Sequence, residues 1–165
     1  MPTSPDDSFE MPQEFGPGSV WVDRVAERSL VGRNQRGVEI RIGHGDGEIN
    51  PGELLKLALI GCAGMSADIP LGRRLGEDFA MRLWAHGTAD EEQDRYLSIA
   101  EQVQLDLSEL GPEEQQRVIS VFERAVAAAC TIERTVVPGV EVTHSIIDTP
   151  HTQQGSGQDQ QGAER

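Results

Sequence analysis

The chain has 165 residues and a formal net charge of −14, with 14 basic residues against 28 acidic ones. This length fits a single domain with loose ends, and a folded part of roughly 130 residues can bury a core without disulfides. The acidic balance argues against nucleic acid and against an anionic membrane surface as partners, because both require clustered Lys or Arg.

The two ends of the chain differ in composition from its middle. Residues 1–17 are rich in Pro, Ser, Asp, Glu and Gly, and residues 149–165 are rich in Gln and Gly. We predict a disordered acidic leader over 1–17, a folded domain over 18–148 and a disordered tail over 149–165. The start of the chain lacks the apolar stretch of a secretion signal, so we expect a cytoplasmic protein whose two cysteines form no structural disulfide.

The first apolar segments predict a β-hairpin. Residues 19–31 mix valines with charges and predict a first strand, and 38–42 alternates strictly and predicts a second. Between them, 34–37 contains Asn and Gly, which accept a positive φ and favour a turn. The Gly/Asp-rich loop 43–48 matches neither the dinucleotide-binding fingerprint nor an EF-hand, so we interpret it as a plain connection.

A helix is predicted from Asn50 to Ala67, and it is the centre of the sequence. Asn50 is a good N-cap, Pro51 suits the first helical position, and Glu53 has the spacing of a capping box. The following residues are apolar on every side, which predicts a helix enclosed by other elements or by a second subunit. The apolar run is interrupted and is too short to span a bilayer.

Cys62 lies in the middle of this helix, between Gly61 and Gly64. These small neighbours allow another backbone or a substrate to approach the sulfur. The apolar interior of a helix raises the pKa of a thiol, and the helix dipole helps little in mid-helix, so we expect an ionised Cys62 to require a cationic partner.

The segments after the helix predict a second hairpin. Pro70 and Gly72 predict a break, or a short second helix that ends near Gly76. Residues 78–86 and 96–107 alternate, and the acidic segment 88–92 joins them, so we predict an antiparallel pair.

A second helix and a last strand complete the pattern. Pro112 opens the helix, and its apolar stripe consists of Val118, Ile119, Phe122, Val126 and Ala129. Cys130 follows on the same stripe, and 140–147 predicts the last strand. The predicted order is β-β-α-β-β-α-β, an α+β fold with antiparallel sheet packed against two helices.

The segment Asn-Pro-x-Glu-Leu-Leu-x(6)-Cys, followed by Cys130 at the end of another helix, resembles the OsmC/Ohr family of organic hydroperoxide resistance and osmotically inducible proteins. The resemblance implies a cytoplasmic, intertwined homodimer with buried central helices and two sites at the subunit interface. It implies a cysteine peroxidase of the oxidative stress response that reduces hydrophobic organic hydroperoxides without a bound cofactor or metal. An external dithiol such as dihydrolipoamide would restore the enzyme.

Carried onto this chain, the family makes Cys62 the peroxidatic and Cys130 the resolving cysteine. The family also uses an arginine from the loop after the first strand, backed by a carboxylate. Arg33 follows a glycine, as the family arginine does, and is our choice, with Arg36 and then Arg28 as substitutes. An ordinary solvated charge is the alternative interpretation of Arg33.

The carboxylate departs from the family pattern. Peroxidase members place the acid directly after the proline, whereas this chain has Gly52 there and Glu53 next. Nine residues turn a helix by about 900° and advance it roughly 13 Å, so Glu53 and Cys62 face opposite sides. A capping box is the alternative role of Glu53.

Two other functions remain open at this point. The same dimer would serve as a binding protein or as a thiol-based redox sensor without efficient turnover, and Gly52 favours these alternatives. Two buried small hydrophobes are the plain alternative for the cysteines. The four histidines show no zinc-ligand spacing, so we expect no metal.

Overall fold

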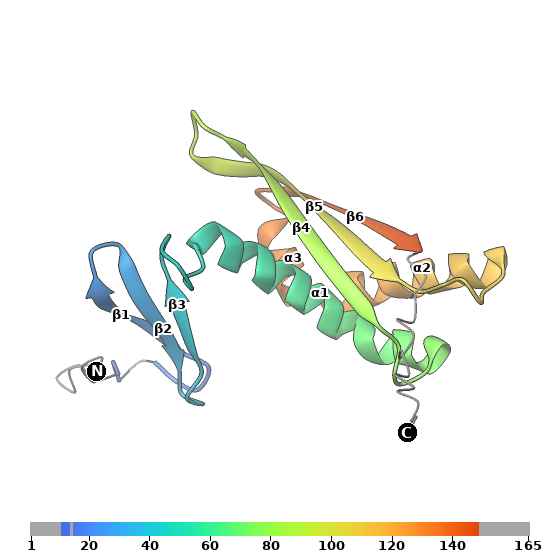
Figure 1. Ribbon diagram of the computed structural model, residues 1–165, viewed down its shortest axis with the longest axis horizontal. Helices are drawn as coiled ribbons and strands as arrows, with labels where there is room; N and C mark the ends of the chain where they lie inside the picture. The colour runs from blue at the N-terminus through green and yellow to red at the C-terminus, as the bar shows by residue number, and fades with distance from the viewer. Residues whose placement is uncertain (1–10, 14, 149–165) are drawn as a thin grey trace, which may run out of the picture. The chain divides into compact units, whose positions relative to one another are not determined.

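The computed structural model describes residues 11–13 and 15–148 (Figure 1). The predicted leader over 1–17 lies mostly outside the described residues, and the predicted tail over 149–165 lies wholly outside them. The chain divides into two compact units, one up to Ala58 and one from Leu59 onward, and each is described by itself.

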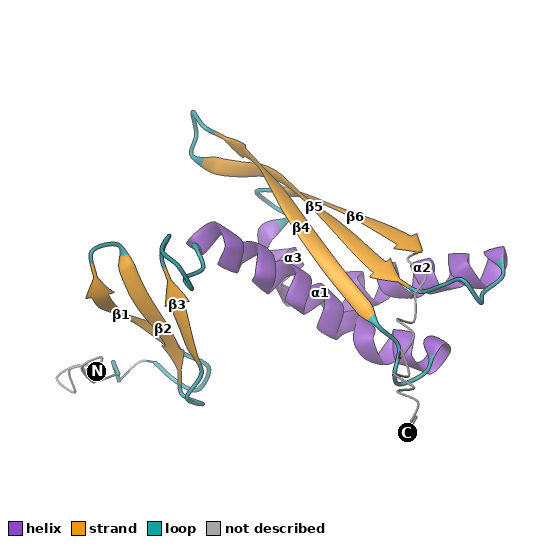
Figure 2. Cartoon of the chain, viewed as in Figure 1, coloured by secondary structure: helices purple, strands orange, loops and turns teal. Residues whose placement is uncertain are grey.

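The first unit holds a three-stranded antiparallel sheet (Figure 2). Its strands are β1 (Val20–Ala26), β2 (Ser29–Asn34) and β3 (Glu39–Ile42), in that order across the sheet. The prediction of one strand over 19–31 was wrong. Ala26 pairs with Ser29 after a register shift, and Arg28 takes a φ of 55°, so the chain reverses within that segment. The predicted turn over 34–37 is confirmed, with Gly37 at a φ of 80°.

Helix α1 (Pro51–Leu75) begins in the first unit and continues in the second. The predicted capping box is confirmed. Glu53 Oε2 accepts from the Asn50 backbone N–H at 2.8 Å, and Asn50 Oδ1 accepts from the Glu53 backbone N–H at 2.9 Å. The predicted break at Pro70 was wrong, because the helix continues through it to Leu75. Leu71 is fully buried there, and such packing offsets the missing backbone bond.

Within this chain α1 is buried along one stripe and not on every side. Leu59, Ala63, Ala67 and Leu71, spaced four apart, are at most 1% exposed. Other apolar side chains of α1 face outward, with Met65 at 83% exposure. The single chain therefore leaves part of the apolar surface of α1 exposed, although the sequence pattern predicts that this surface is buried.

The length of α1 also corrects a prediction. The helix has 25 residues and, by length and composition alone, could cross a membrane, so the apolar run was not too short. Length and composition alone do not distinguish a membrane-spanning helix from the core helix of a soluble protein, which passes the same test.

The second unit holds the other sheet, with the order β4 (Met81–Asp90), β5 (Arg95–Leu105) and β6 (Glu141–Asp148). The predicted antiparallel hairpin of β4 and β5 is confirmed. Strand β6 pairs with β5 in parallel, which the predicted antiparallel sheet did not include. A parallel neighbour requires a long crossover, and α2 (Pro112–Ala129) and α3 (Thr131–Val136) lie in it.

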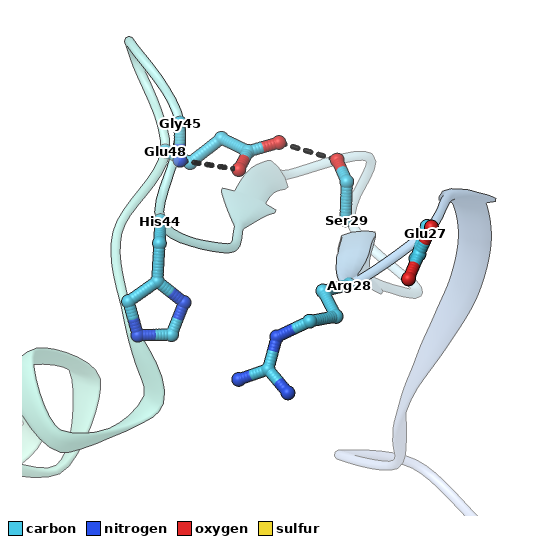
Figure 3. A pocket seen from close by; sticks show the side chains of 6 residues that line it. All are labelled: Glu27, Arg28, Ser29, His44, Gly45 and Glu48. Carbon is cyan, nitrogen blue, oxygen red and sulfur yellow. Dashed lines mark hydrogen bonds between the residues drawn. The ribbon is translucent and has the colours of Figure 1, made fainter.

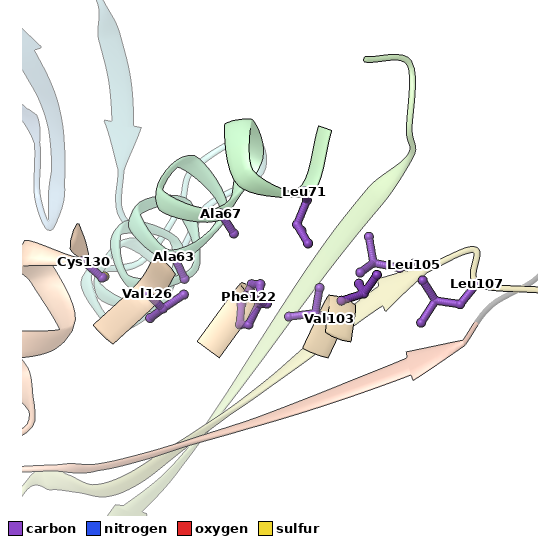
Figure 4. Packing of buried hydrophobic residues seen from close by; sticks show 10 residues of the cluster. Ala63, Ala67, Leu71, Val103, Leu105, Leu107, Phe122, Val126 and Cys130 are labelled. Atoms are coloured by element: carbon purple, nitrogen blue, oxygen red, sulfur yellow. The ribbon is translucent and has the colours of Figure 1, made fainter. Parts of the chain in front are cut away.

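The α+β class is confirmed, and the order is β-β-β-α-β-β-α-α-β in place of the predicted one. The core of the second unit combines α1, β5 and α2 (Figure 4). The predicted stripe of α2 supplies Val118, Phe122 and Val126, all at most 2% exposed. Cys130 closes this cluster at one end and is fully buried.

Candidate redox site

The two cysteines meet in the second unit. Cys62 lies in the middle of α1 and is partly buried, and Cys130 lies between α2 and α3 and is fully buried. Both are free thiols, and Cys62 packs against the buried cluster that contains Cys130. The fold therefore brings together the two residues that the sequence selected as a redox pair.

Cys130 is held by the ends of two helices. Its backbone N–H donates to the Val126 carbonyl at 2.8 Å and so closes α2. Its sulfur accepts from the Glu133 backbone N–H at 3.4 Å and so caps α3. The position of this sulfur is thus set by backbone geometry on both sides.

The surroundings of Cys62 favour its thiolate. Burial raises its pKa, but hydrogen bonds from the Ile132 N–H, the Cys130 thiol, the Thr131 N–H and the Ser66 hydroxyl outweigh burial, and the pKa is lowered overall. The sequence suggested that only a cation could do this. Thr131 provides one of these donors through its backbone N–H, which a proline at this position would lack.

The surroundings of Cys130 favour its thiol. Burial is the main cause that raises its pKa, to about 11, and the charges of Cys62 and Glu133 act in the same direction. At neutral pH the pair therefore consists of one more acidic sulfur and one protonated sulfur. Such a pair is divided into an attacking nucleophile and a hydrogen-bond donor beside it.

A buried charge cluster lies beside Cys130, and we call Glu101, Glu133 and His144 the inner cluster. Glu101 on β5 is paired in register with His144 on β6, and the side chain of Glu101 is fully buried. His144 Nε2 lies 3.0 Å from Glu101 Oε2 and 3.7 Å from Glu133 Oε2. Neither Glu101 nor Glu133 was predicted as a functional residue from the sequence. Glu101 could have been noticed because its charge interrupts the apolar alternation of residues 96–107.

Arg33 has other partners than a thiol in this chain. It lies on β2 and not in a loop, and it forms ion pairs with Asp23 and, at 2.7 Å, with Glu39. We call these three residues the outer cluster. Arg36 lies in the exposed turn, where its backbone N–H donates to Asn34 Oδ1 at 2.9 Å.

The loop after the first strand contains Arg28. Its side chain lines a pocket together with His44 and Glu48, and Figure 3 shows the Arg28 and His44 side chains extending to the same side. Glu48 accepts from the Ser29 hydroxyl and from the Gly45 backbone N–H. A side chain at position 43 would collide with the Glu48 carboxylate, which explains Gly43. Arg28, ranked last from the sequence, is the arginine that this structure places after the first strand.

Glu53 is an N-terminal cap of α1. Its carboxylate accepts from the Asn50 backbone N–H, as described above. Over the described residues, no group of three or more His, Cys, Asp or Glu side chains is placed to hold a metal ion.

Comparisons with known proteins establish the family and the fold of this chain. The chain is 44% identical over 131 residues to the uncharacterized protein Rv2923c of Mycobacterium tuberculosis, covering 78% of this chain and 96% of that protein. Its fold is similar to an OsmC-like protein of Vibrio cholerae, at a TM-score of 0.63 and 14% identity, covering 81% of this chain and 100% of that one. It is also similar to the organic hydroperoxide resistance protein OhrB of Bacillus subtilis, at a TM-score of 0.54 and 16% identity. That match covers 78% of this chain and 96% of the other. No family model matches the sequence.

The chain thus belongs to the same family as the mycobacterial protein and has the OsmC/Ohr fold. The resemblance noted in the sequence is confirmed at this level. Structural neighbours at such low sequence identity show the fold alone.

Proposed function

We propose that this protein is a thiol-dependent peroxidase that reduces organic hydroperoxides through Cys62 and Cys130. One observation supports this above all others: the two cysteines come together in the second unit in unlike surroundings, with the pKa of Cys62 lowered and that of Cys130 raised. Two cysteines that served only as small buried hydrophobic residues would not need pKa values shifted in opposite directions. An organic hydroperoxide resistance protein is among the proteins with the same fold.

The reaction has three balanced steps. The Cys62 thiolate attacks the distal peroxide oxygen, the O–O bond breaks, and Cys62 becomes a sulfenic acid while the alkoxide takes a proton and leaves as alcohol. The Cys130 thiol then attacks the Cys62 sulfur, a disulfide forms, and water leaves with the Cys130 proton. An external dithiol, of the dihydrolipoamide kind, reduces the disulfide by two exchange steps and is itself oxidised. No bound cofactor is needed.

We propose further that the working form is a homodimer in the cytoplasm, with neither nucleic acid nor a membrane as partner. Met65 and Ile69 on α1 are 83% and 65% exposed, and a side chain at Gly61 would meet no atom within 4 Å. A second copy would cover this apolar face and would provide hydrophobic surroundings for an organic peroxide. Sedimentation at micromolar concentration tests the dimer, and a monomer would contradict it.

A cation near the substrate remains part of the proposal. Arg33 was our choice, but two carboxylates already neutralise it, whereas Arg28 lines a pocket with His44. We therefore propose Arg28 as the arginine of the reaction and keep Arg33 as the alternative. The predicted catalytic role of Glu53 remains a proposal beside its capping bonds.

A second function is a binding or redox-sensing dimer without efficient turnover. The capping role of Glu53 and the ion pairs of Arg33 favour it, because both side chains that the family pattern selects are engaged elsewhere. In that case the disulfide would form slowly and only under excess oxidant.

Mass spectrometry of the reduced protein during titration with cumene hydroperoxide separates the two functions. We expect a Cys62–Cys130 disulfide at stoichiometric peroxide, no oxidation in Cys62→Ser, and an accumulating sulfenic acid in Cys130→Ser. Thiols that stay reduced until peroxide is in large excess would exclude the peroxidase. Turnover retained in Cys62→Ser would exclude the mechanism.

A further inference from the structure

The inner cluster has no role in the reaction as written above, although it lies beside one of the two thiols. Its central residue is Glu101, whose carboxylate is wholly removed from solvent on the middle strand of the second sheet. Burying a carboxylate is costly unless a cation or donors compensate it. His144 is the cation that lies against it, at 3.0 Å.

Glu133 connects this ion pair to the cysteine. Its carboxylate oxygen lies 3.7 Å from His144 Nε2, and its backbone N–H donates to the Cys130 sulfur at 3.4 Å. The same residue therefore meets the histidine with its side chain and the resolving sulfur with its backbone. A single residue of α3 thus connects His144 with Cys130.

His144 is surrounded by acidic groups from every element packed against it. They are Glu101 on β5, Glu133 on α3 and Glu123 on α2, and the Phe122 ring lies edge-on at 5.9 Å. The contact with the Glu101 carboxylate is the main cause that raises the pKa of His144, and burial opposes it. A positive charge on His144 attracts all three carboxylates, whereas a neutral imidazole leaves them to repel one another.

We propose that His144 is a positioning residue for the resolving step: its positive charge, held by Glu101, fixes Glu133 and thereby keeps the Cys130 sulfur against the sulfur of Cys62. This inference rests on the proposed pairing of the two cysteines. It adds a dependence on pH that belongs to the second step only. Above the pKa of His144, α3 loses the positive charge that holds Glu133. Cys130 then attacks the Cys62 sulfur more slowly than the thiolate fraction of Cys130 alone predicts.

A disulfide reagent isolates the two steps without any peroxide. Dithiobis(nitrobenzoate) reacts with the Cys62 thiolate to give a mixed disulfide and one coloured nitrothiobenzoate. Cys130 then attacks the Cys62 sulfur, the protein disulfide forms, and the second nitrothiobenzoate leaves as the Cys130 proton passes to solvent. Stopped-flow absorbance of the full-length protein records the steps as two phases, and Cys130→Ser shows only the first.

The wild type provides the first readout. The second phase accelerates about tenfold per pH unit wherever the thiolate fraction of Cys130 limits it. We expect this rise to flatten above the pKa of His144, which proton NMR of the imidazole measures independently. An unbroken rise across the measured pKa of His144 would overturn the proposal.

Two variants and one control give the second readout. Misplacing a reacting atom by about 1 Å costs on the order of 100-fold, so His144→Gln should slow the second phase by roughly 10- to 100-fold and leave the first phase unchanged. Glu101→Gln should move the flattening to lower pH together with the pKa of His144, a shift that a purely structural role would not cause. His86→Gln, at an exposed position on β4, should match the wild type.

The outcomes separate this inference from the proposed function. A second phase that has the same rate and pH profile in both variants as in the wild type overturns the role of His144. Normal behaviour in this assay with no reaction toward cumene hydroperoxide would exclude the peroxidase and leave the positioning role intact. If His144→Gln does not fold, Glu101→Gln and the wild-type profile still decide.

Discussion

The outer and inner clusters have the same composition, one cation between two carboxylates, in different surroundings. In the outer cluster Arg33 pairs with Asp23 and Glu39, whose side chains are 25% and 61% exposed. In the inner cluster His144 lies against Glu101, which is fully buried. A permanent cation among accessible strands fastens a sheet. A titratable cation beside a buried carboxylate, connected to the Cys130 thiol through Glu133, makes the position of that thiol depend on pH.

The largest expected difference between the clusters is in stability. Glu101→Ala should lower the free energy of unfolding by roughly 3 kcal/mol, the low end for breaking a buried ion pair, because His144 can release its proton. Urea denaturation followed by circular dichroism measures this. Asp23→Ala is the matched change in the outer cluster, and its loss should be smaller because Arg33 keeps Glu39. Equal losses would show that burial does not distinguish the two clusters.

The next effect concerns an arginine outside both clusters. Arg28→Gln should slow the oxidation of Cys62 by cumene hydroperoxide about tenfold, as expected for losing one charge-assisted hydrogen bond of roughly 1.4 kcal/mol. Arg33→Gln should change this rate less, since Asp23 and Glu39 already neutralise its charge. Stopped-flow kinetics of both variants test this. A larger effect at Arg33 would restore the choice made from the sequence.

A smaller effect concerns pH and stability. The pKa of His144 is raised in the folded state, mainly by its contact with the Glu101 carboxylate, so its contribution is fully present below the unfolded value of about 6.5. The contribution is lost as pH rises through the folded pKa, with a slope of at most about 1.4 kcal/mol per pH unit for one proton. Urea midpoints between pH 5 and 9, as a rough working range, should show this loss in the wild type.

The matched variant for this pH effect is His144→Gln. Its urea midpoints should lack this loss, whereas Arg33→Gln should keep it, because that variant leaves His144 and Glu101 in place. A wild-type stability that rises through this range would have the wrong sign.

The smallest effect concerns a hydroxyl beside Cys62. The Ser66 hydroxyl donates to the Cys62 carbonyl and is the smallest of the causes that lower the pKa of the thiol, so that pKa should rise slightly in Ser66→Ala. The pH dependence of iodoacetamide alkylation measures it. Thr135→Ala is a matched control, since Thr135 on α3 donates to the carbonyl four residues earlier at 2.8 Å, as Ser66 does to Cys62. An unchanged alkylation profile would mean that the backbone N–H groups suffice.

The sequence predicted the parts of the fold that local chemistry determines. The capping box of α1 and the apolar stripe of α2 depend on residues three or four apart. The capping box is confirmed, and the stripe is confirmed at Val118, Phe122 and Val126, whereas Ala129 is exposed. The turn at Arg28 was missed because a non-glycine residue with positive φ leaves no compositional signal. The parallel pairing of β6 was missed because it depends on a long crossover.

The candidate site divides in the same way. Its two cysteines were found from their spacing. The N–H groups of Thr131 and Ile132 that favour the Cys62 thiolate were not predicted, because every residue except proline has a backbone N–H and its direction depends on the fold. The short helix α3 that carries them was also missed. Glu101 and His144 meet only because two strands pair in register, which no local pattern reports.

The capping of α3 by the Cys130 sulfur has a consequence for observing the protein. A sulfur that enters a disulfide gains a covalent neighbour and becomes a poorer acceptor, so the Glu133 amide loses its partner when the pair is oxidised. That amide should then exchange its hydrogen with deuterated water faster in the oxidised protein than in the reduced one. The protection of one backbone amide thus becomes a reporter of redox state that requires neither a substrate nor a label.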